Sequence, residues 1–365
     1  MLIPYVNLNK QFYKEKKELN KIFNKVLSSG QYVGGKYIEE FEKNMSRYCN
    51  TKYCVSLNSG TDALVLALHI LGVRRGDEVI TTPNSFIAST AVIVHLGAIP
   101  VFVAVLDDQN INPDLIEEKI TKKTKVIMPV HLTGRVSRMS KILNIAKKYN
   151  LKVIEDAAQS VGSMYKNKKS GSFGDIGCFS AHPLKNLNAI GDAGYLTTNS
   201  KNIYNKIKDL RNHGMTNRNI VKNFGYVSRM DNLQAAILNY RLKNLKKIIL
   251  KRRNNANIYR KLIKTPEVFL PSENKEEFNT YHTFVIQASK RNKLKKYLKS
   301  HGIDTSIHYP IPIHLQPAAK KLGYKKGDFK KTEVQSNRIL TLPINQFLTN
   351  KEIKFISKKI NQFYK

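Results

Sequence analysis

The sequence predicts an α/β protein in three layers, with helices covering both faces of a mostly parallel sheet. Two observations predict it. Between residues 53 and 158, short apolar runs alternate with segments whose apolar residues recur at helical spacing. The apolar runs, among them DEVITTP, IPVFVAV and KVIMPVHL, are nearly continuous, as expected of parallel strands buried on both faces. We expect a smaller α+β domain after this large one.

The first half of the chain contains most of the expected sheet. A helix over 34–48 precedes a strand over 53–57, and the loop 58–61 opens directly into an apolar helix. Pro113 lies near the first turn of a further expected helix, a position that proline favours. The alternating elements that follow are strands at 77–83, 99–105, 125–132 and 152–158, and helices at 85–98, 112–120 and 137–150.

The second half begins with two strands, 175–182 and 193–199, joined across a segment that contains Lys185. Residues 230–263 then read as one helix without Pro or Gly, about 50 Å long at 1.5 Å per residue. A helix of that length more plausibly connects two domains than fits inside one. The remaining elements are a strand at 281–288 and helices at 292–302 and 350–364.

We therefore expect two domains, a large one over residues 1–245 and a small C-terminal one over 246–365. A chain of 365 residues is long enough for both.

The net charge of +35 is the most unusual bulk property. A basic surface gives phosphate affinity that does not depend on base sequence, so nucleic-acid binding is one interpretation. The lysines are spread along the whole chain, without a basic arm or a run of five or more. We favour a solvated, lysine-rich surface over nucleic-acid binding. Its positive field would still attract a substrate that carries a diphosphate.

Targeting and metal signals are not evident in the sequence. The N-terminal apolar run is too short for a signal peptide, and no apolar stretch approaches the roughly 18 residues of a membrane span. Three cysteines, Cys49, Cys54 and Cys178, are too few and too irregular for a disulfide framework or a structural metal. We expect a soluble, cytoplasmic protein without a metal or a membrane partner.

Lys185 is unusual because few other lysines lie near it in the sequence. It is the only lysine between Gly171 and Gly194, in a segment of small residues within a lysine-rich chain. A lysine in a tight, partly desolvated loop has a lowered pKa and can form a Schiff base. By itself this pattern also fits a surface lysine in a turn.

Two other polar features fall at the carboxyl ends of predicted parallel strands, where ligands bind in open α/β sheets. Gly60 and Thr61 begin a helix, and such a terminus attracts anions. Asp156 ends an apolar strand, and a buried carboxylate there requires a cation or several hydrogen bonds. Taken singly, a capped helix and a structural carboxylate stay open as interpretations.

Together these groups point to pyridoxal phosphate. This cofactor needs a lysine for its aldehyde, a carboxylate for its ring nitrogen, a phosphate-binding cup and a flat side chain over the ring. Phe86 follows the strand at 77–83 and is a candidate for that flat side chain, although a core phenylalanine is the alternative.

Several further motifs make the chain recognisable. They include NSGTDAL, TTPNSFIAST, VIEDAAQSVGS, GDIGCFSAHPLKNLNAIGDAG, RMDNLQAAIL, YHTFVI and HYPIPIHLQ, in that order. With them the chain resembles the DegT/StrS-type sugar aminotransferases, pyridoxal-phosphate enzymes of the aspartate aminotransferase fold (fold type I). The resemblance covers nearly the whole chain.

The resemblance implies roles for the cofactor contacts. Lys185 would form the Schiff base with the cofactor and then carry the proton between cofactor and substrate. Asp156 would pair with the pyridine nitrogen, and Gln159 would contact the ring hydroxyl. The other implied contacts are to the phosphate, from Gly60, Thr61 and Ser180, and to the ring face, from Phe86.

The substrate side is implied by motif position alone. The residues in family motifs that line or lie near the expected cleft are His182, Asn186, Arg229, His308 and His314. For His314 a structural role stands beside a substrate contact. The family usually has Asn where this chain has Val227, so either Ser228 substitutes or a phosphate contact from the neighbouring subunit is absent.

The resemblance implies a ping-pong aminotransferase in which glutamate is the amino donor and a nucleotide-linked keto-deoxysugar is the acceptor. Lysine at position 185 separates the chain from related sugar dehydratases, which have histidine there. HYPIPIHLQPA looks more like members that aminate carbon 3 than like those that aminate carbon 4. A homodimer is also implied. A catalytically idle, regulatory family member stays open as the alternative.

Overall fold

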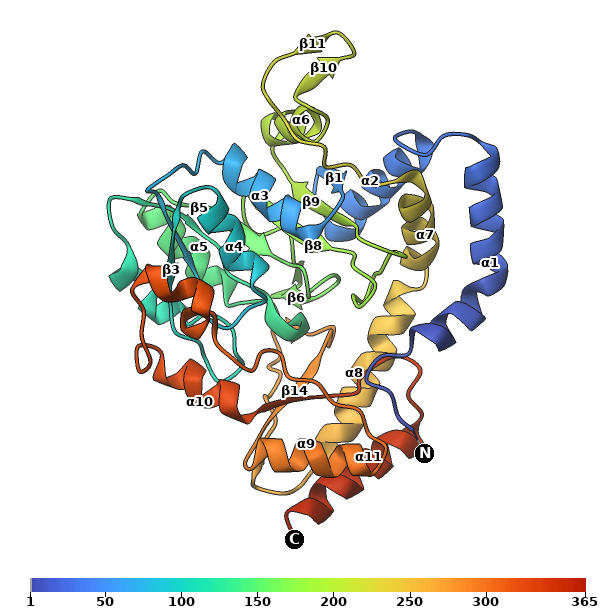
Figure 1. Cartoon of the computed structure of the whole chain (residues 1–365), viewed down its shortest axis with the longest axis vertical. Helices are drawn as coiled ribbons and strands as arrows, with labels where there is room; N and C mark the ends of the chain where they lie inside the picture. Colours follow the sequence, from blue (N-terminus) through green and yellow to red (C-terminus); the bar gives the residue numbers. More distant parts are fainter. Residues whose placement is uncertain (1) are drawn as a thin grey trace.

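The computed structural model describes residues 2–365, and its centre is a seven-stranded sheet (Figure 1). The strands of this sheet are β1 (Tyr53–Leu57), β2 (Glu78–Thr81), β3 (Ile99–Phe102), β4 (Thr124–Ile127), β5 (Lys152–Asp156), β8 (Ile176–Ser180) and β9 (Gly194–Thr198). Their order is β1-β9-β8-β5-β4-β2-β3. Strand β9 is antiparallel to both of its neighbours, and every other pair is parallel. The predicted mostly parallel sheet is confirmed.

Helices cover both faces of this sheet, which confirms the three layers. The helices of the large domain are α1 (Leu8–Ser28), α2 (Lys36–Cys49), α3 (Gly60–Ile70), α4 (Ala88–His95), α5 (Met139–Lys148), α6 (Lys201–Leu210) and α7 (Asn232–Leu242). On one face, α3 and α4 pack with Ile154 and Cys178. On the other, α2 and α7 pack with Phe179. Neighbours such as Cys178 and Phe179 point to opposite faces because side chains alternate along a strand.

The smaller C-terminal part has a core of its own. Its elements are α8 (Leu245–Leu262), β12 (Val268–Phe269), β14 (Phe284–Ala288), α9 (Arg291–Ser300), α10 (Lys330–Arg338), β15 (Ile339–Leu342) and α11 (Asn350–Phe363). The sheet order is β12-β14-β15, and one apolar cluster joins residues of α8, α9 and α11 to it. Ile3 also belongs to this cluster. We propose the division at residue 245 as the domain boundary, and the separate core supports it.

Short elements complete the chain. The strands are β6 (Met164–Tyr165), β7 (Lys168–Lys169), β10 (Met215–Asn217), β11 (Ile220–Val221) and β13 (Glu277–Phe278). The 3-10 helices are Pro113–Leu115, Glu117–Lys119, Leu132–Gly134, Ile313–Leu315 and Pro317–Leu322. The β10–β11 hairpin projects from the body beside α6, at the top of Figure 1. Within residues 2–365, no helix has the length and apolar character needed to cross a membrane.

Three expectations about helices were wrong or incomplete. The expected helix at 112–120 is two 3-10 turns, because the backbone is already extended at Ile120. The single long helix at 230–263 is two helices, α7 and α8. Between them the N–H of Asn244 bonds to the carbonyl of Arg241, three residues back rather than four, and asparagine is a weak helix former. Helices α1, α6 and α10 were not predicted at all.

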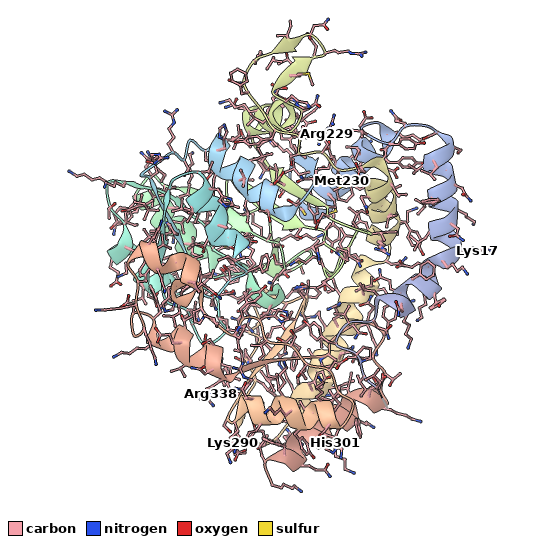
Figure 2. The ribbon with its side chains drawn as sticks, viewed as in Figure 1. Lys17, Arg229, Met230, Lys290, His301 and Arg338 are labelled. Carbon is pink, nitrogen blue, oxygen red and sulfur yellow. The ribbon has the colours of Figure 1, made fainter. Side chains whose placement is uncertain are left out.

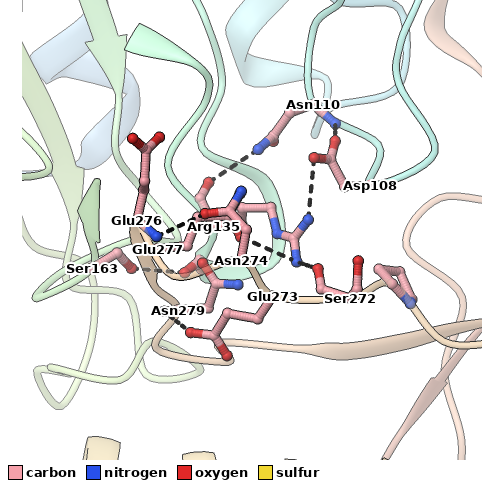
Figure 3. Close-up of polar contacts among 12 residues, drawn as sticks. Asp108, Asn110, Arg135, Ser163, Ser272, Glu273, Asn274, Glu276, Glu277 and Asn279 are labelled. Atoms are coloured by element: carbon pink, nitrogen blue, oxygen red, sulfur yellow. Dashed lines mark hydrogen bonds and ion pairs between the residues drawn. The ribbon is translucent and has the colours of Figure 1, made fainter. Parts of the chain in front are cut away.

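A polar network joins the large domain to the segment before β14 (Figure 3). The Arg135 guanidinium donates to the Asp108 carboxylate at 3.2 Å and lies 3.4 Å from the Glu277 carboxylate. Strand β13, which contains Glu277, pairs with β6 of the large domain. Farther along this segment, the carbonyl of Thr280 accepts from the Asn186 amide at 3.1 Å. The neighbour of Lys185 is therefore tied to the C-terminal part.

Candidate active site

One cavity of about 410 Å³ opens at the carboxyl ends of the parallel strands. Its volume is in the usual range for small-molecule sites, roughly 300–1,000 Å³. The predicted site residues that line it are Gly60, Thr61, Phe86, Asp156, Gln159, Ser180, His182, Lys185 and His308. They come from loops that are far apart in sequence. The sheet brings them together because β1, β2, β5 and β8 all end at this edge.

Lys185 lies in the connection between β8 and β9, and this connection is closed by backbone hydrogen bonds. The N–H of Ala181 bonds to the Ala193 carbonyl, and the N–H of Lys185 bonds to the His182 carbonyl, both at 2.8 Å. Helices outside the loop also hold it. The Arg241 guanidinium of α7 donates to the Asn188 carbonyl at 2.8 Å. The amine is therefore carried by a rigid loop.

The surroundings of Lys185 bring the pKa of its amine closer to neutrality. Burial lowers the pKa of Lys185 to about 8, and the Asp156 carboxylate opposes part of this shift. The amine has no hydrogen-bond partner among the side chains and carbonyls of residues 2–365. A buried, partner-free amine whose pKa lies near neutrality can act as a nucleophile and as a proton carrier.

Asp156 ends β5 and is 4% exposed. One carboxylate oxygen accepts from the Ser89 hydroxyl at 2.7 Å, and the other accepts from the Ala158 N–H at 3.2 Å. Neither partner is charged, so the carboxylate keeps its negative charge available for a cationic group in the cavity. Such a group would complete the pairing that buried charges require.

The start of α3 borders the cavity with its first turn. Ser59 caps the helix by accepting the N–H of Asp62 at 3.1 Å, and the first helical N–H groups have no partner within the helix. Gly60 is in close contact with β8, because a Cβ built on it would lie 2.7 Å from the Ser180 Cβ. Gly194 of β9 is equally constrained, since its Cβ would lie 2.4 Å from the Gly60 nitrogen. The helix start thus faces the Lys185 loop.

Gln159 has a defined amide orientation. Its Oε1 accepts the N–H of Thr133 at 2.8 Å, and the amide also forms a hydrogen bond with Tyr309 that opposes the rise in the pKa of Tyr309 caused by burial. Thr133 is in a left-handed conformation with φ of 64°, which is strained for a β-branched residue. This conformation presents the N–H of Thr133 to Gln159.

The sequence profile of the DegT/DnrJ/EryC1/StrS aminotransferase family matches residues 13–361. The chain belongs to this family. The match spans the cavity, both domains and the Lys185 loop, so the predicted family is confirmed.

Similar proteins cover the full length of this family member. A dTDP-3-amino-3,6-dideoxy-alpha-D-galactopyranose transaminase of Aneurinibacillus thermoaerophilus is 39% identical over 365 residues, covering 99% of each chain. A protein of Geobacillus stearothermophilus called a pleiotropic regulatory protein is 36% identical, over 100% of this chain and 99% of the relative.

Two solved structures have the same fold as this chain over nearly its whole length. The structure of DesV from S. venezuelae, in complex with a ketimine intermediate, superposes with a TM-score of 0.97. It is 33% identical and covers 99% of this chain and 98% of that chain. NtdA from Bacillus subtilis, with bound cofactor PMP, has a TM-score of 0.93 at 32% identity. That match covers 100% of this chain and 86% of NtdA. The predicted fold type is confirmed.

Three of the predicted substrate-side residues of this family member do not line the cavity, and one of them is the buried Asn186, whose amide donates to the Thr280 carbonyl. Arg229 lies at the base of the β10–β11 projection (Figure 2), where its guanidinium bonds to Asn212 at 3.2 Å. His314 is 2% exposed, bonds to the Glu333 carboxylate at 3.1 Å and packs edge-on against Phe329. The structure places His314 in a structural setting.

The departure at Val227 also has a clear geometry. Val227 is 55% exposed, whereas Ser228 is fully buried and its hydroxyl donates to Asn58 at 3.2 Å. The Ser228 hydroxyl is therefore engaged within its own subunit. It does not extend from the surface as a replacement for the usual asparagine.

Sequence reasoning missed several cavity residues. His282 and Tyr309 line the cavity together with Ser89 and Asp192. Burial lowers the pKa of His282 well below its ordinary value, and Lys185 adds to this effect. His282 and Tyr309 lie in YHTFVI and HYPIPIHLQ, motifs already recognised in the sequence. Their presence in those motifs was the available signal, but motif membership does not show which side chain faces the site.

Proposed function

We propose that this chain, a pyridoxal-phosphate-dependent nucleotide-sugar aminotransferase, transfers an amino group from glutamate to carbon 3 of a nucleotide-linked keto-deoxysugar. One observation carries the chemistry: the Lys185 amine, with a pKa of about 8, shares a cavity with the Asp156 carboxylate and an anion-binding helix start. The similarity to NtdA with bound PMP supports the cofactor.

The residues present fit pyridoxal phosphate. Asp156 offers a carboxylate without a cationic partner, which suits a protonated ring nitrogen. The glycine at position 60 lets the first turn of α3 lie directly against Ser180, where a side chain would clash, and this brings the free N–H groups of α3 beside Ser180 as a site suited to a phosphate. When bound, the cofactor supplies the electron sink that makes amino-group transfer feasible.

Each protein group then has a proposed task. Lys185 would hold the cofactor covalently and then carry a proton, for which a pKa near neutrality is suited. Gln159, whose Oε1 is occupied by Thr133, would approach the ring hydroxyl with its Nε2 amide, beside Tyr309. Phe86 lines the cavity and is 55% exposed, so its ring is free to cover the cofactor face. His182 and His308 face the substrate.

The choice of carbon 3 rests on the relatives. The transaminase from A. thermoaerophilus is named for an amino group at carbon 3, and the HYPIPIHLQPA segment favours the same position. Amination at carbon 4 is the alternative. Incubation with a panel of keto-sugar nucleotides and glutamate, followed by NMR location of the new amine, tests the choice. An amine at carbon 4 would exclude our proposal.

A regulatory role without catalysis is the second candidate, because one full-length relative is called a pleiotropic regulatory protein. Lys185 and its cavity favour catalysis. Purified protein with pyridoxal phosphate should develop visible absorbance that is lost on borohydride reduction and never forms in Lys185→Ala. Failure of the folded wild-type protein to take up the cofactor would favour the regulatory candidate.

We also propose a homodimer. Large apolar side chains are exposed close to the cavity and on the neighbouring loops: Phe86, Leu184, Ile190 and Val227 are each between 46% and 55% exposed. Covering them with a second copy would remove this apolar surface from water. Sedimentation equilibrium checks this, and a fully active monomer would contradict it.

A further inference from the structure

Arg252 of α8 differs from most other buried arginines of the chain. Arg135 and Arg241 are 7% and 6% exposed, and each contacts a carboxylate, of Asp108 and of Glu15 respectively. Arg252 is also 7% exposed, but no carboxylate within residues 2–365 lies in contact with it. Its Nε has no hydrogen-bond partner. The guanidinium is thus a buried cation without a counter-ion.

The hydrogen bonds that Arg252 does make leave part of its binding capacity unused. Its Nη1 donates to the carbonyls of Tyr281 and His282 at 3.1 Å, and its Nη2 donates to Gln346 at 3.3 Å. Burial lowers the pKa of Arg252 to about 10, so the group is still charged at neutral pH. A buried charge is stable only when it is paired, and neutral carbonyls compensate it incompletely.

Arg252 lines a chamber directly behind the wall of the active-site cavity. The chamber measures about 40 Å³. Three residues, Leu184, His282 and His308, line both the chamber and the cavity. No hydrogen bond reaches Nδ1 of His282, so its ring is not held by that atom. A water needs about 10–15 Å³, so the chamber has room for a few waters or for a carboxylate that displaces them.

A second, smaller space also lies beside Arg252 and the loop of Lys185. It measures about 20 Å³ and is lined by both Lys185 and Arg252. Arg252 therefore lies along the walls of two spaces that adjoin the loop of Lys185. Helix α8, which carries it, is not part of the proposed cofactor site.

Charge identifies the kind of ligand that this position suits. Among the residues lining the cavity and these two spaces, Lys185 and Arg252 are the cationic side chains. His308 and His282 do not add charge, because burial lowers the pKa of His308 to about 4 and that of His282 well below its ordinary value. An amino donor carries at least one carboxylate. It would be repelled by Asp156, and Lys185 is used in the chemistry.

We propose that Arg252 binds a carboxylate of the amino donor while the donor's amino group is transferred. The inference rests on the proposed aminotransferase function and assigns it a donor-binding residue. The unpartnered Nε–H and the Nη groups provide charge-assisted hydrogen bonds to the carboxylate oxygens. The planar guanidinium suits two carboxylate oxygens better than an ammonium would.

The two halves of a ping-pong reaction make the proposal testable. In the holoenzyme, conversion of the cofactor by glutamate and its return by a keto-sugar nucleotide are followed separately by absorbance. Arg252→Gln should raise the glutamate concentration for half-maximal conversion about 10- to 100-fold, the range for a lost charge-assisted bond. The sugar half should change less than threefold. Arg252→Lys, which retains the charge, should lie between Arg252→Gln and the wild type in the glutamate half.

A second readout does not depend on turnover. Glutarate, a dicarboxylate without an amine, should bind the wild-type holoenzyme in calorimetry and bind Arg252→Gln at least tenfold more weakly. The matched control is Arg291→Gln. Arg291 is 6% exposed, also has no carboxylate contact, and donates to the Ile339 carbonyl at 2.8 Å away from these cavities. Its glutarate affinity and both half-reactions should match those of the wild type.

The possible results distinguish a failure of the Arg252 carboxylate site from a failure of the proposed aminotransferase function. An equal loss in both half-reactions, or no loss in the glutamate half, would show that Arg252 only supports the fold and would overturn the proposal. So would a donor-specific loss in Arg229→Gln with none in Arg252→Gln. If the wild type binds glutarate through Arg252 without transaminating, the proposed function fails while the carboxylate site stands. If the wild type does not bind glutarate, the carboxylate site fails.

Discussion

Lys185 and Lys169 are both lysines drawn from solvent, and burial lowers the pKa of each. They differ in what surrounds the amine. The Lys169 amine donates to the Tyr48 carbonyl and lies 3.9 Å from the centre of the Tyr48 ring. The Lys185 amine faces a cavity of about 410 Å³ and has an acid, Asp156, as its electrostatic neighbour. Burial alone therefore does not make a lysine reactive. The decisive difference is an amine left unpartnered beside open space.

The largest expected effect is on turnover. Lys185→Ala should lower the rate of amino-group transfer by at least about a thousandfold, because both the covalent attachment and the proton carrier are lost. Lys169→Met should leave the rate within about threefold. Steady-state kinetics with glutamate and the best keto-sugar nucleotide compares the two. Similar losses in both variants would remove the distinction between the two lysines.

The second-largest effect is expected at Asp156, the acidic neighbour of the Lys185 amine. Asp156→Asn keeps an acceptor for Ser89 but removes the charge, so turnover should fall about a hundredfold as the cofactor loses its ring partner. In the cofactor-free protein the pKa of Lys185 should fall below about 8, because Asp156 raises it. The pH dependence of reductive methylation at Lys185 measures this change. An unchanged or higher pKa would mean that Asp156 does not act on the amine.

A smaller effect is expected on stability. The pKa of Lys185 is about 8 in the folded protein and 10.5 in the reference state, so the unfolded chain binds more protons between these values. Stability from this group therefore rises with pH from about 8 to 10.5 and is lowest below pH 8. At pH 7, Lys185→Met should stabilise the cofactor-free protein by up to about 3 kcal/mol.

Urea unfolding at several pH values checks this third prediction. The gain in Lys185→Met should shrink as the pH rises from about 8 to 10.5, because above this range the wild-type amine is neutral in both states. A gain that does not change with pH would indicate better packing of methionine rather than relief of a buried charge.

The smallest effect should come from a partnered residue outside the cavity. His314 resembles Lys169 in that a nitrogen of its side chain is already bonded: its Nε2 is hydrogen-bonded to the Glu333 carboxylate. His314→Gln should cost about 1 kcal/mol of stability and leave both half-reactions within twofold. Thermal unfolding and single-turnover absorbance measure these changes. A loss of rate in the sugar half-reaction alone would indicate that His314 contacts the substrate after all.

Much of the fold was predictable because its signals are local. The apolar runs that form β1 to β5 and β8 to β9 are short and bounded, and buried parallel strands leave that pattern whatever the tertiary contacts. The edge where Gly60, Asp156 and Lys185 meet follows from the parallel order alone. Helix α1 was missed because its many lysines mask the apolar stripe that includes Leu19 and Val26.

The rest of the site depended on tertiary contacts that sequence patterns do not encode. The break before α8 follows from one shifted hydrogen bond at Asn244. The backbone N–H of Thr133, a residue in a strained conformation, donates a hydrogen bond to Gln159, which is 26 residues away. Arg252 looks like one more basic residue on a lysine-rich helix, and its burial appears only when the N-terminal segment and the loop at 281–282 close over it.

Strand β9, the single reversed strand of the sheet, has a consequence for how such an enzyme can diversify. Both ends of the Lys185 loop are anchored in adjacent antiparallel strands, and Gly194 presses against the start of α3. An insertion in this loop, or a side chain at Gly194, would displace the amine and the first turn of α3 at the same time. We therefore expect new sugar preferences to arise in peripheral segments, such as those carrying Phe86 and His308, while this hairpin stays constant in length.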